Sequence, residues 1–157
     1  MPLDGEWARA DVLRVLRDVC PNDRLDWAHI AKLYNFDLQA LDDPQGIVPI
    51  TAWHGTFEYV ANSLNDDAIM FDMFNKLDVG SFSIFDYVFA CAPSLRDACQ
   101  AWVRFIQIRT NAYRIKFVET ETGAFIEWPS LEGRGEWRQN MFARIGWATR
   151  QLEHALD

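Results

Sequence analysis

Aromatic and arginine side chains in the middle of this sequence are the residues whose chemistry suits binding of a small molecule. Ligand pockets have mostly apolar walls and a few fixed polar groups, and an arginine fork binds a carboxylate or phosphate through paired hydrogen bonds. Arg104, Arg109 and Arg114 lie where a predicted helix gives way to a predicted strand. The residues that we expect to form a ligand site are Trp53, Phe57, Phe85, Tyr87, Arg104, Tyr113 and Arg114.

The same residues have a second interpretation that involves no ligand. Aromatic side chains also fill hydrophobic cores, and the arginines are then solvated or paired with Glu119 and Glu127. Both interpretations stay open at the level of sequence.

Catalytic and metal-binding patterns are not found in the sequence. His29, His54 and His154 lie in distant segments without metal-ligand spacing. Paired aspartates such as 66–67 stand where turns and helix caps are expected, and the glycines form no phosphate-binding loop. We therefore predict no catalytic residue, no metal and no cofactor. A small hydrolase or isomerase that uses clustered carboxylates is the most distant alternative.

The cysteines do not form a recognisable framework. Cys20, Cys91 and Cys99 are odd in number, and their spacing fits neither a set of disulfides nor a zinc motif. We expect them to pack as small hydrophobic residues.

Charge and apolar patterning limit the partners of the chain. The formal net charge is −8 over 157 residues, which has the wrong sign for neutralising DNA phosphates. Charged residues interrupt every long apolar run, and Asp4 and Glu6 stand where a signal peptide would need basic and apolar residues. We expect a cytoplasmic protein that contacts no membrane and does not by itself hold DNA.

Periodicity predicts a mainly helical chain with one pair of strands. Helices are expected over residues 7–19, 26–34, 51–64, 69–74, 84–91, 95–106 and 137–156. Residues 35–49 are expected to form a loop with one helical turn. Alternating apolar residues predict a strand over 113–117, which a turn connects to a partner over 125–128. The predicted class is α+β, with a mostly helical N-terminal part, a small antiparallel sheet and a C-terminal amphipathic helix.

Two of these helices begin with a capping signal. Ser94 follows Pro93 and precedes Asp97 by three residues, which is the pattern of an N-cap with an acidic group in the first turn. Thr51 is predicted to cap the helix that ends near Leu64.

Several segments of the chain also form a recognisable series. In order they are residues 36–44 (FDLQALDDP), 47–50 (IVPI), 87–98 (YVFACAPSLRDA), 103–105 and 113–117. This series resembles the N-terminal effector domain of AraC/XylS-type transcription regulators, in the arabinose-binding-like version of the ornithine-utilisation regulator group. The resemblance covers about residues 30–157, and residues 93–98 are its most specific part. Where that family usually has a glycine before Tyr87, this chain has Asp86, which implies a different pocket shape.

The resemblance implies a function for the whole chain. Residues 1–157 would form a single effector-sensing and dimerisation domain, cut before the rest of the sensor and the DNA-binding part. Its partners would be a small organic effector and a second copy of itself, and DNA would be bound only through a C-terminal domain not present in this chain. The alternative is an interaction module in which the helix over 137–156 self-associates and no small molecule binds.

Overall fold

The structure is a computed structural model that describes residues 5–20, 24–82, 84–128 and 137–156. Within these ranges it has seven α-helices, two short 3-10 helices and four short strands, which confirms the predicted α+β class. The elements in chain order are β1 (Trp7–Arg9), α1 (Asp11–Val19), α2 (Trp27–Leu33), η1 (Leu38–Leu41), β2 (Ile47–Pro49), α3 (Ile50–Leu64), α4 (Ile69–Lys76), α5 (Ile84–Ala90), α6 (Leu95–Phe105), η2 (Ile106–Ile108), β3 (Lys116–Thr120), β4 (Gly123–Glu127) and α7 (Arg138–Leu156). No helix in the described ranges is both long and apolar enough to cross a bilayer.

A small sheet that the sequence did not predict ties the N-terminus to two later segments. β1 pairs antiparallel with β2, in a register that sets Ala8 opposite Val48. Ala8 also forms a bridge with Thr110, and the Arg9 amide donates to the Arg109 carbonyl at 2.7 Å. The helix predicted from residue 7 therefore begins only at residue 11, and the predicted loop over 35–49 contains a strand. These pairings join residues far apart in the chain, so no local periodicity announces them.

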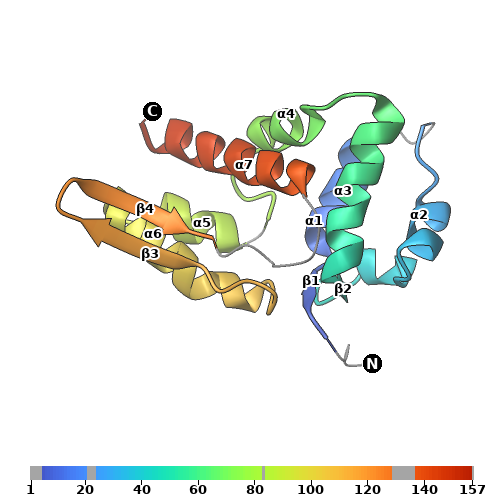
Figure 1. The fold of residues 1–157 in the computed structure, drawn as a ribbon, viewed down its shortest axis with the longest axis horizontal. Helices are drawn as coiled ribbons and strands as arrows, with labels where there is room; N and C mark the ends of the chain where they lie inside the picture. The colour runs from blue at the N-terminus through green and yellow to red at the C-terminus, as the bar shows by residue number, and fades with distance from the viewer. Residues whose placement is uncertain (1–4, 21–23, 83, 129–136, 157) are drawn as a thin grey trace.

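Helix α3 lies between α7 on one side and α2 on the other (Figure 1). Phe57 and Val60 on this helix are fully buried in the core. The helix begins at Ile50 after Pro49, and no side chain caps it, so the predicted Thr51 cap is wrong. It ends at Asn65, whose left-handed φ of 52° breaks the helix as expected for a C-cap.

Helices α4 and α7 lie against one another along the upper edge of the molecule in Figure 1. Gly146 of α7 makes this close approach possible, because a Cβ there would lie 2.4 Å from the Phe71 carbonyl oxygen. The contact is with backbone of α4, which cannot swing aside as a long side chain can. Gly146 thus fixes how deeply α7 sits.

Helix α6 and the hairpin of β3 and β4 lie at the end of the molecule opposite α2 (Figure 1). The predicted cap is confirmed, since the Ser94 hydroxyl accepts a hydrogen bond from the Asp97 amide at 3.1 Å. Arg96 on α6 pairs with Glu119 on β3 at 2.7 Å. The predicted first strand, over 113–117, is shifted along the chain: it starts at residue 116 and ends at residue 120, and the buried Tyr113 precedes it in an irregular segment.

Helix α7 is the predicted C-terminal helix, but its buried side is unusual. Met141, Ile145 and Leu152 are 40–49% exposed, although they belong to the apolar stripe of the sequence. The buried side contains polar residues in addition to Ala143 and Trp147. The buried polar residues of α7 are Gln139, Asn140, Arg150 and Gln151.

Candidate functional site

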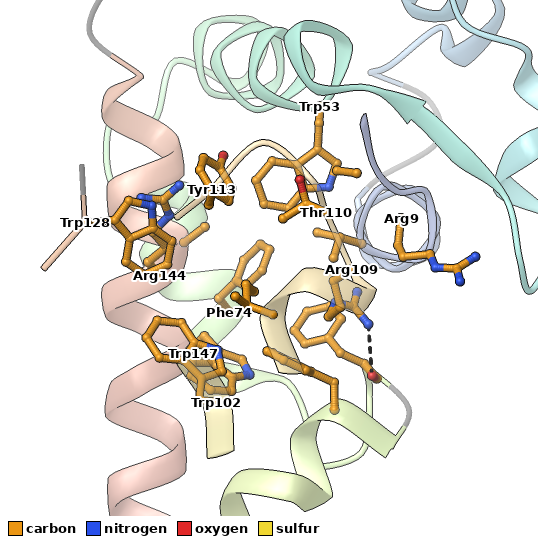
Figure 2. Close-up of a pocket in the computed structure, with 16 residues that line it drawn as sticks. Arg9, Trp53, Phe74, Trp102, Arg109, Thr110, Tyr113, Trp128, Arg144 and Trp147 are labelled. Atoms are coloured by element: carbon orange, nitrogen blue, oxygen red, sulfur yellow. Dashed lines mark hydrogen bonds between the residues drawn. The ribbon is translucent and has the colours of Figure 1, made fainter. Parts of the chain in front are cut away.

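A cavity of about 90 Å³ lies where α7 meets β1, α3, α5 and α6, and it is partly open to solvent. Its wall is almost entirely apolar, and Figure 2 shows Trp53, Phe74, Trp102 and Trp147, which come from four different helices, arranged around the same space. The lining residues are Ala8, Arg9, Val12, Trp53, Phe74, Phe82, Phe85, Trp102, Ile106, Arg109, Thr110, Tyr113, Trp128, Ala143, Arg144 and Trp147.

Aromatic rings in mutual contact make up most of this wall. The Trp102 and Trp147 rings stack with centroids 5.4 Å apart, and Phe85 stacks on Trp147 at 5.8 Å. On the far side Phe74 and Phe82 stack at 5.4 Å. Offset and tilted ring pairs at these separations attract one another beyond simple burial, so the rings form a firm wall around the cavity.

Three of the predicted ligand residues line the cavity together, namely Trp53, Phe85 and Tyr113. Phe57 is completely buried behind this wall, where its ring packs on Trp53 at 4.7 Å. Tyr87 is half exposed on the other side of α5 and does not reach the cavity.

The predicted arginines Arg104 and Arg114 are both exposed and do not line the cavity. Arg114 lies between the buried Tyr113 and Ile115. Its side chain is exposed while those of its two neighbours are buried. Arg104 lies near the ring of its neighbour Phe105, at 5.5 Å.

Two other cavity arginines have partners of their own. Arg109 forms a 2.5 Å ion pair with Asp11 and donates to the Phe82 carbonyl at 3.4 Å. Arg9 donates to the carbonyls of Gln45 and Ile108, at 2.7 and 3.3 Å. Its guanidinium points away from the cavity in Figure 2.

Arg144 differs from both, because it faces aromatic rings instead of an acid or backbone carbonyls. Its guanidinium carbon lies 3.6 Å from the Trp128 ring centroid and 4.5 Å from that of Tyr113. Burial lowers the pKa of Arg144 from its ordinary value to about 10, and the nearby Tyr113 only partly counters this effect. The group stays charged at neutral pH.

Sequence reasoning missed Arg144 and Trp147, which α7 contributes to the cavity together with Ala143. The signal was present in their spacing, because residues three and four apart share one face of a helix. The larger apolar residues of α7 drew attention to a different face of the helix.

A buried polar cluster anchors Tyr113 in the wall. The Tyr113 hydroxyl lies against His54 Nε2, and the Asn140 amide donates to the same hydroxyl at 3.2 Å. Asn140 also contacts His54 Nε2 at 2.9 Å. Burial raises the pKa of Tyr113, so its hydroxyl keeps its proton at neutral pH.

A second buried cluster, centred on Asp86, holds the opposite part of the wall. Asp86 is fully buried, and each of its carboxylate oxygens accepts hydrogen bonds. The donors are the Trp147 indole at 2.7 Å, Arg150 at 2.9 Å, Gln151 at 3.1 Å, and the amides of Gly80 at 2.9 Å and Phe82 at 3.2 Å. Burial lowers the pKa of Arg150, and Asp86 works against that shift. Asp86 thus fixes the lining residues Phe82 and Trp147 without lining the cavity itself.

Metal chemistry has no assembled ligand set in the part of the chain that the structure describes, where no three His, Cys, Asp or Glu side chains converge. All three cysteines are free, and only Cys20 is buried. The arrangement is suited to enclosing an apolar body beside a positive group.

Comparison with known protein families identifies the family of this chain. The family described as the arabinose-binding domain of AraC transcription regulator, N-terminal, matches residues 25–155. No curated protein sequence matches the chain.

Proposed function

Because the chain belongs to the family of N-terminal arabinose-binding domains of AraC transcription regulators, we propose that its aromatic cavity binds a small organic effector. The conformational change that accompanies effector binding is then transmitted to a DNA-binding domain elsewhere in the regulator. The family consists of regulatory effector-binding domains and not of enzymes, and we assign this chain no reaction. A regulator that acts on DNA would work in the cytoplasm, which is the location expected from the sequence.

The observation that carries the proposal is the cavity itself. Protein interiors are close-packed, and a space of about 90 Å³ walled by aromatic rings loses contacts that a ligand would restore. Its lining comes from Ala8 at one end of the chain and Trp147 at the other. A ligand there would contact segments from both ends of the chain at once.

Helix α7 is the element through which we expect occupancy to be transmitted. It contributes Ala143, Arg144 and Trp147 to the wall, so a ligand touches it directly. A ligand shifts a conformational equilibrium only by its different affinities for the two states. In this proposal the two states differ in how α7 is seated, and the effector favours the seated one.

Thermal unfolding in the presence of candidate effectors tests the proposal. Amino acids, fatty acids, sugars including arabinose, and nucleotides form the panel. A true effector at about one hundred times its Kd stabilises the fold by about 2.7 kcal/mol, which raises Tm by roughly 5–10 °C for a domain of this size.

A cavity-filling variant makes the test specific. Ala143→Leu places extra atoms in the cavity, whereas Ala124→Leu adds the same atoms at an exposed position on β4. The stabilisation should disappear in the first variant and persist in the second, with circular dichroism confirming that both are folded. A folded wild-type domain that no compound class stabilises would refute the proposal.

A second candidate function has one observation in its favour. Met141, Ile145 and Leu152 leave an apolar stripe exposed on α7, and such a stripe suits the same helix of a second copy. This function predicts a mass that rises with concentration in sedimentation experiments and falls to that of a monomer in Ile145→Glu. A wild-type chain that stays monomeric at every concentration would rule it out.

A further inference from the structure

The polar groups of the cavity wall point to the chemistry of the ligand. Arg9, Arg109 and Arg144 are the three cationic residues in the lining. Arg9 is bonded to backbone carbonyls, and Arg109 is neutralised by Asp11. Among the described residues, no carboxylate pairs with Arg144, so its positive charge alone is left for a ligand.

Most hydrogen-bonding capacity of Arg144 is also unused by the residues that the structure describes. A guanidinium carries five N–H donors in one plane. Within the described ranges, Arg144 contacts the faces of Trp128 and Tyr113, the Tyr113 hydroxyl, and the Met141 sulfur at 3.8 Å. Stacked rings cover the faces of the guanidinium and leave its N–H edge free.

Two further donors in the same wall have no acceptor. The indole N–H groups of Trp53 and Trp128 are buried and have no hydrogen-bond partner among the described residues. The Thr110 hydroxyl, in contrast, donates to the Trp7 carbonyl at 2.5 Å and accepts from the Ala112 amide at 3.1 Å. The lining therefore has an excess of donors and needs acceptors.

Burial of Arg144 without an acid is energetically unfavourable. Removing an unpaired charge from water destabilises it, as the lowered pKa shows. An anion beside the guanidinium would restore the charged form and satisfy the free edge. A methionine or leucine at this position would fill the same space without this penalty, so packing alone does not require an arginine.

We propose that the effector is a small carboxylic acid with an apolar body, whose carboxylate binds Arg144 while the body lies among Trp53, Trp102 and Trp147. The inference rests on the proposed function, since it names the ligand class of the same cavity. The volume of about 90 Å³ limits the body to a short aliphatic chain or a single ring that extends into the mouth.

Matched acids and amides test the role of charge. The probes are hexanoate, benzoate and phenylacetate, and each acid is compared with its own amide (hexanamide, benzamide and phenylacetamide). Binding is measured by calorimetry at pH 7.5. The amide keeps the shape and one acceptor but removes the negative charge. We expect at least one acid to bind at least about tenfold more tightly than its amide, because hydrogen bonds to charged groups are the stronger ones.

Variants of Arg144 test the residue itself. Arg144→Met and Arg144→Gln both remove the charge, and Arg104→Met removes one charge from an exposed site outside the cavity. We expect both Arg144 variants to weaken binding of the acid by at least about tenfold and to weaken binding of the amide much less, whereas Arg104→Met binds both as the wild type does. Circular dichroism confirms the fold of each variant, and either Arg144 variant suffices.

The outcomes separate this inference from the function on which it rests. Amides that bind as tightly as acids would overturn the carboxylate inference, and so would acids that bind Arg144→Met as tightly as the wild type. In both cases the proposal that the cavity binds an effector would still stand. Binding of a sugar or nucleotide with none of the acids has the same meaning. A folded domain that binds no compound of either panel overturns both.

Discussion

Arg144 and Arg150 lie on the same helix, six residues apart, yet their surroundings are opposite. Arg150 is paired with the buried Asp86 at 2.9 Å and also donates to the carbonyls of Leu77 and Asp78. Arg144 contacts ring faces and, among the described residues, no acid. The fold requires the charge at position 150 and only tolerates the charge at position 144. This difference indicates which part of α7 serves stability and which part is left for a ligand.

The Asp86 cluster also explains a departure from the family pattern. The resemblance noted in the sequence implied a glycine at this position, and we expected Asp86 to alter the pocket shape. The structure shows that its effect is indirect, because Asp86 accepts from the Phe82 amide and the Trp147 indole and so holds two lining residues. Asp86 is a positioning residue of the wall.

The largest expected effect on stability is at the buried pair of Asp86 and Arg150. Asp86→Ala removes a buried carboxylate, which leaves the Arg150 charge without its acid and two backbone amides without an acceptor. We expect the free energy of unfolding in urea to fall by about 3–5 kcal/mol. Asp72→Ala is the control, since Asp72 forms an exposed pair with Lys76 on α4, and its loss should change stability by less than about 1 kcal/mol. A loss below 1 kcal/mol for Asp86→Ala would place the two arginines in the same class.

The next effect concerns the seat of α7, which sets the position of both arginines. Gly146→Ala forces a Cβ against the Phe71 backbone, so we expect a loss of roughly 1–3 kcal/mol from overpacking. Gly123→Ala is the matched control, because nothing lies within 4 Å of the added atom. It should leave stability unchanged or slightly raised. Equal denaturation midpoints for the two variants would contradict the close α4–α7 contact.

A smaller effect is expected where the polar cluster meets the cavity. Tyr113→Phe removes the hydroxyl that contacts His54 and Asn140, but these two residues still contact one another at 2.9 Å. We expect a loss of about 1–2 kcal/mol, measured by urea unfolding. A gain in stability would show that the hydroxyl is not satisfied by this cluster.

The smallest effect is expected at the unpaired arginine. The pKa of Arg144 is lowered to about 10, so its charge opposes folding below that pH, and the opposition fades as the pH rises further towards the ordinary value. Arg144→Met removes this penalty at neutral pH and also the contacts with Trp128 and Tyr113, which offset it. We expect the unfolding free energy at pH 7 to change by less than about 1 kcal/mol. A loss as large as that of Asp86→Ala would show that the fold depends on both charges.

Local sequence signals predicted much of the fold. The Ser94 cap, the break at Asn65 and the hairpin over β3 and β4 all follow from a few adjacent residues, because caps and tight turns are local structures. The β1–β2 pairing was missed, since it joins Ala8 to Val48 across forty residues. Nothing within either three-residue strand distinguishes it from a helix end or a loop.

The candidate site was predictable only in part, for a related reason. The rings of Trp53, Phe85 and Tyr113 were identified because large aromatic side chains in a short chain are mostly buried, either in the core or in the wall of a pocket. Arg144 was missed because its suitability for a ligand depends on which groups surround it in the fold. Arg104 and Arg114, which are closer to the rings in sequence, appeared equally suitable although both are exposed. In α7 the buried side contains Gln139 and Arg150 while Met141 is exposed. A hydrophobic stripe identifies the inner side of a helix only when burial is governed by apolar contact, and polar clusters govern it here.

The order in which the cavity wall is synthesised has a consequence for when a ligand can be recognised. The wall begins with Ala8 and is completed by Trp147, so a ribosome-bound chain that lacks α7 has most of the rings but no enclosure. Domains fold as units when their sequence has emerged, and the pocket closes only once α7 has joined the other elements. A compound that binds it would therefore be recognised after α7 has packed and would not guide the earlier folding of the preceding elements.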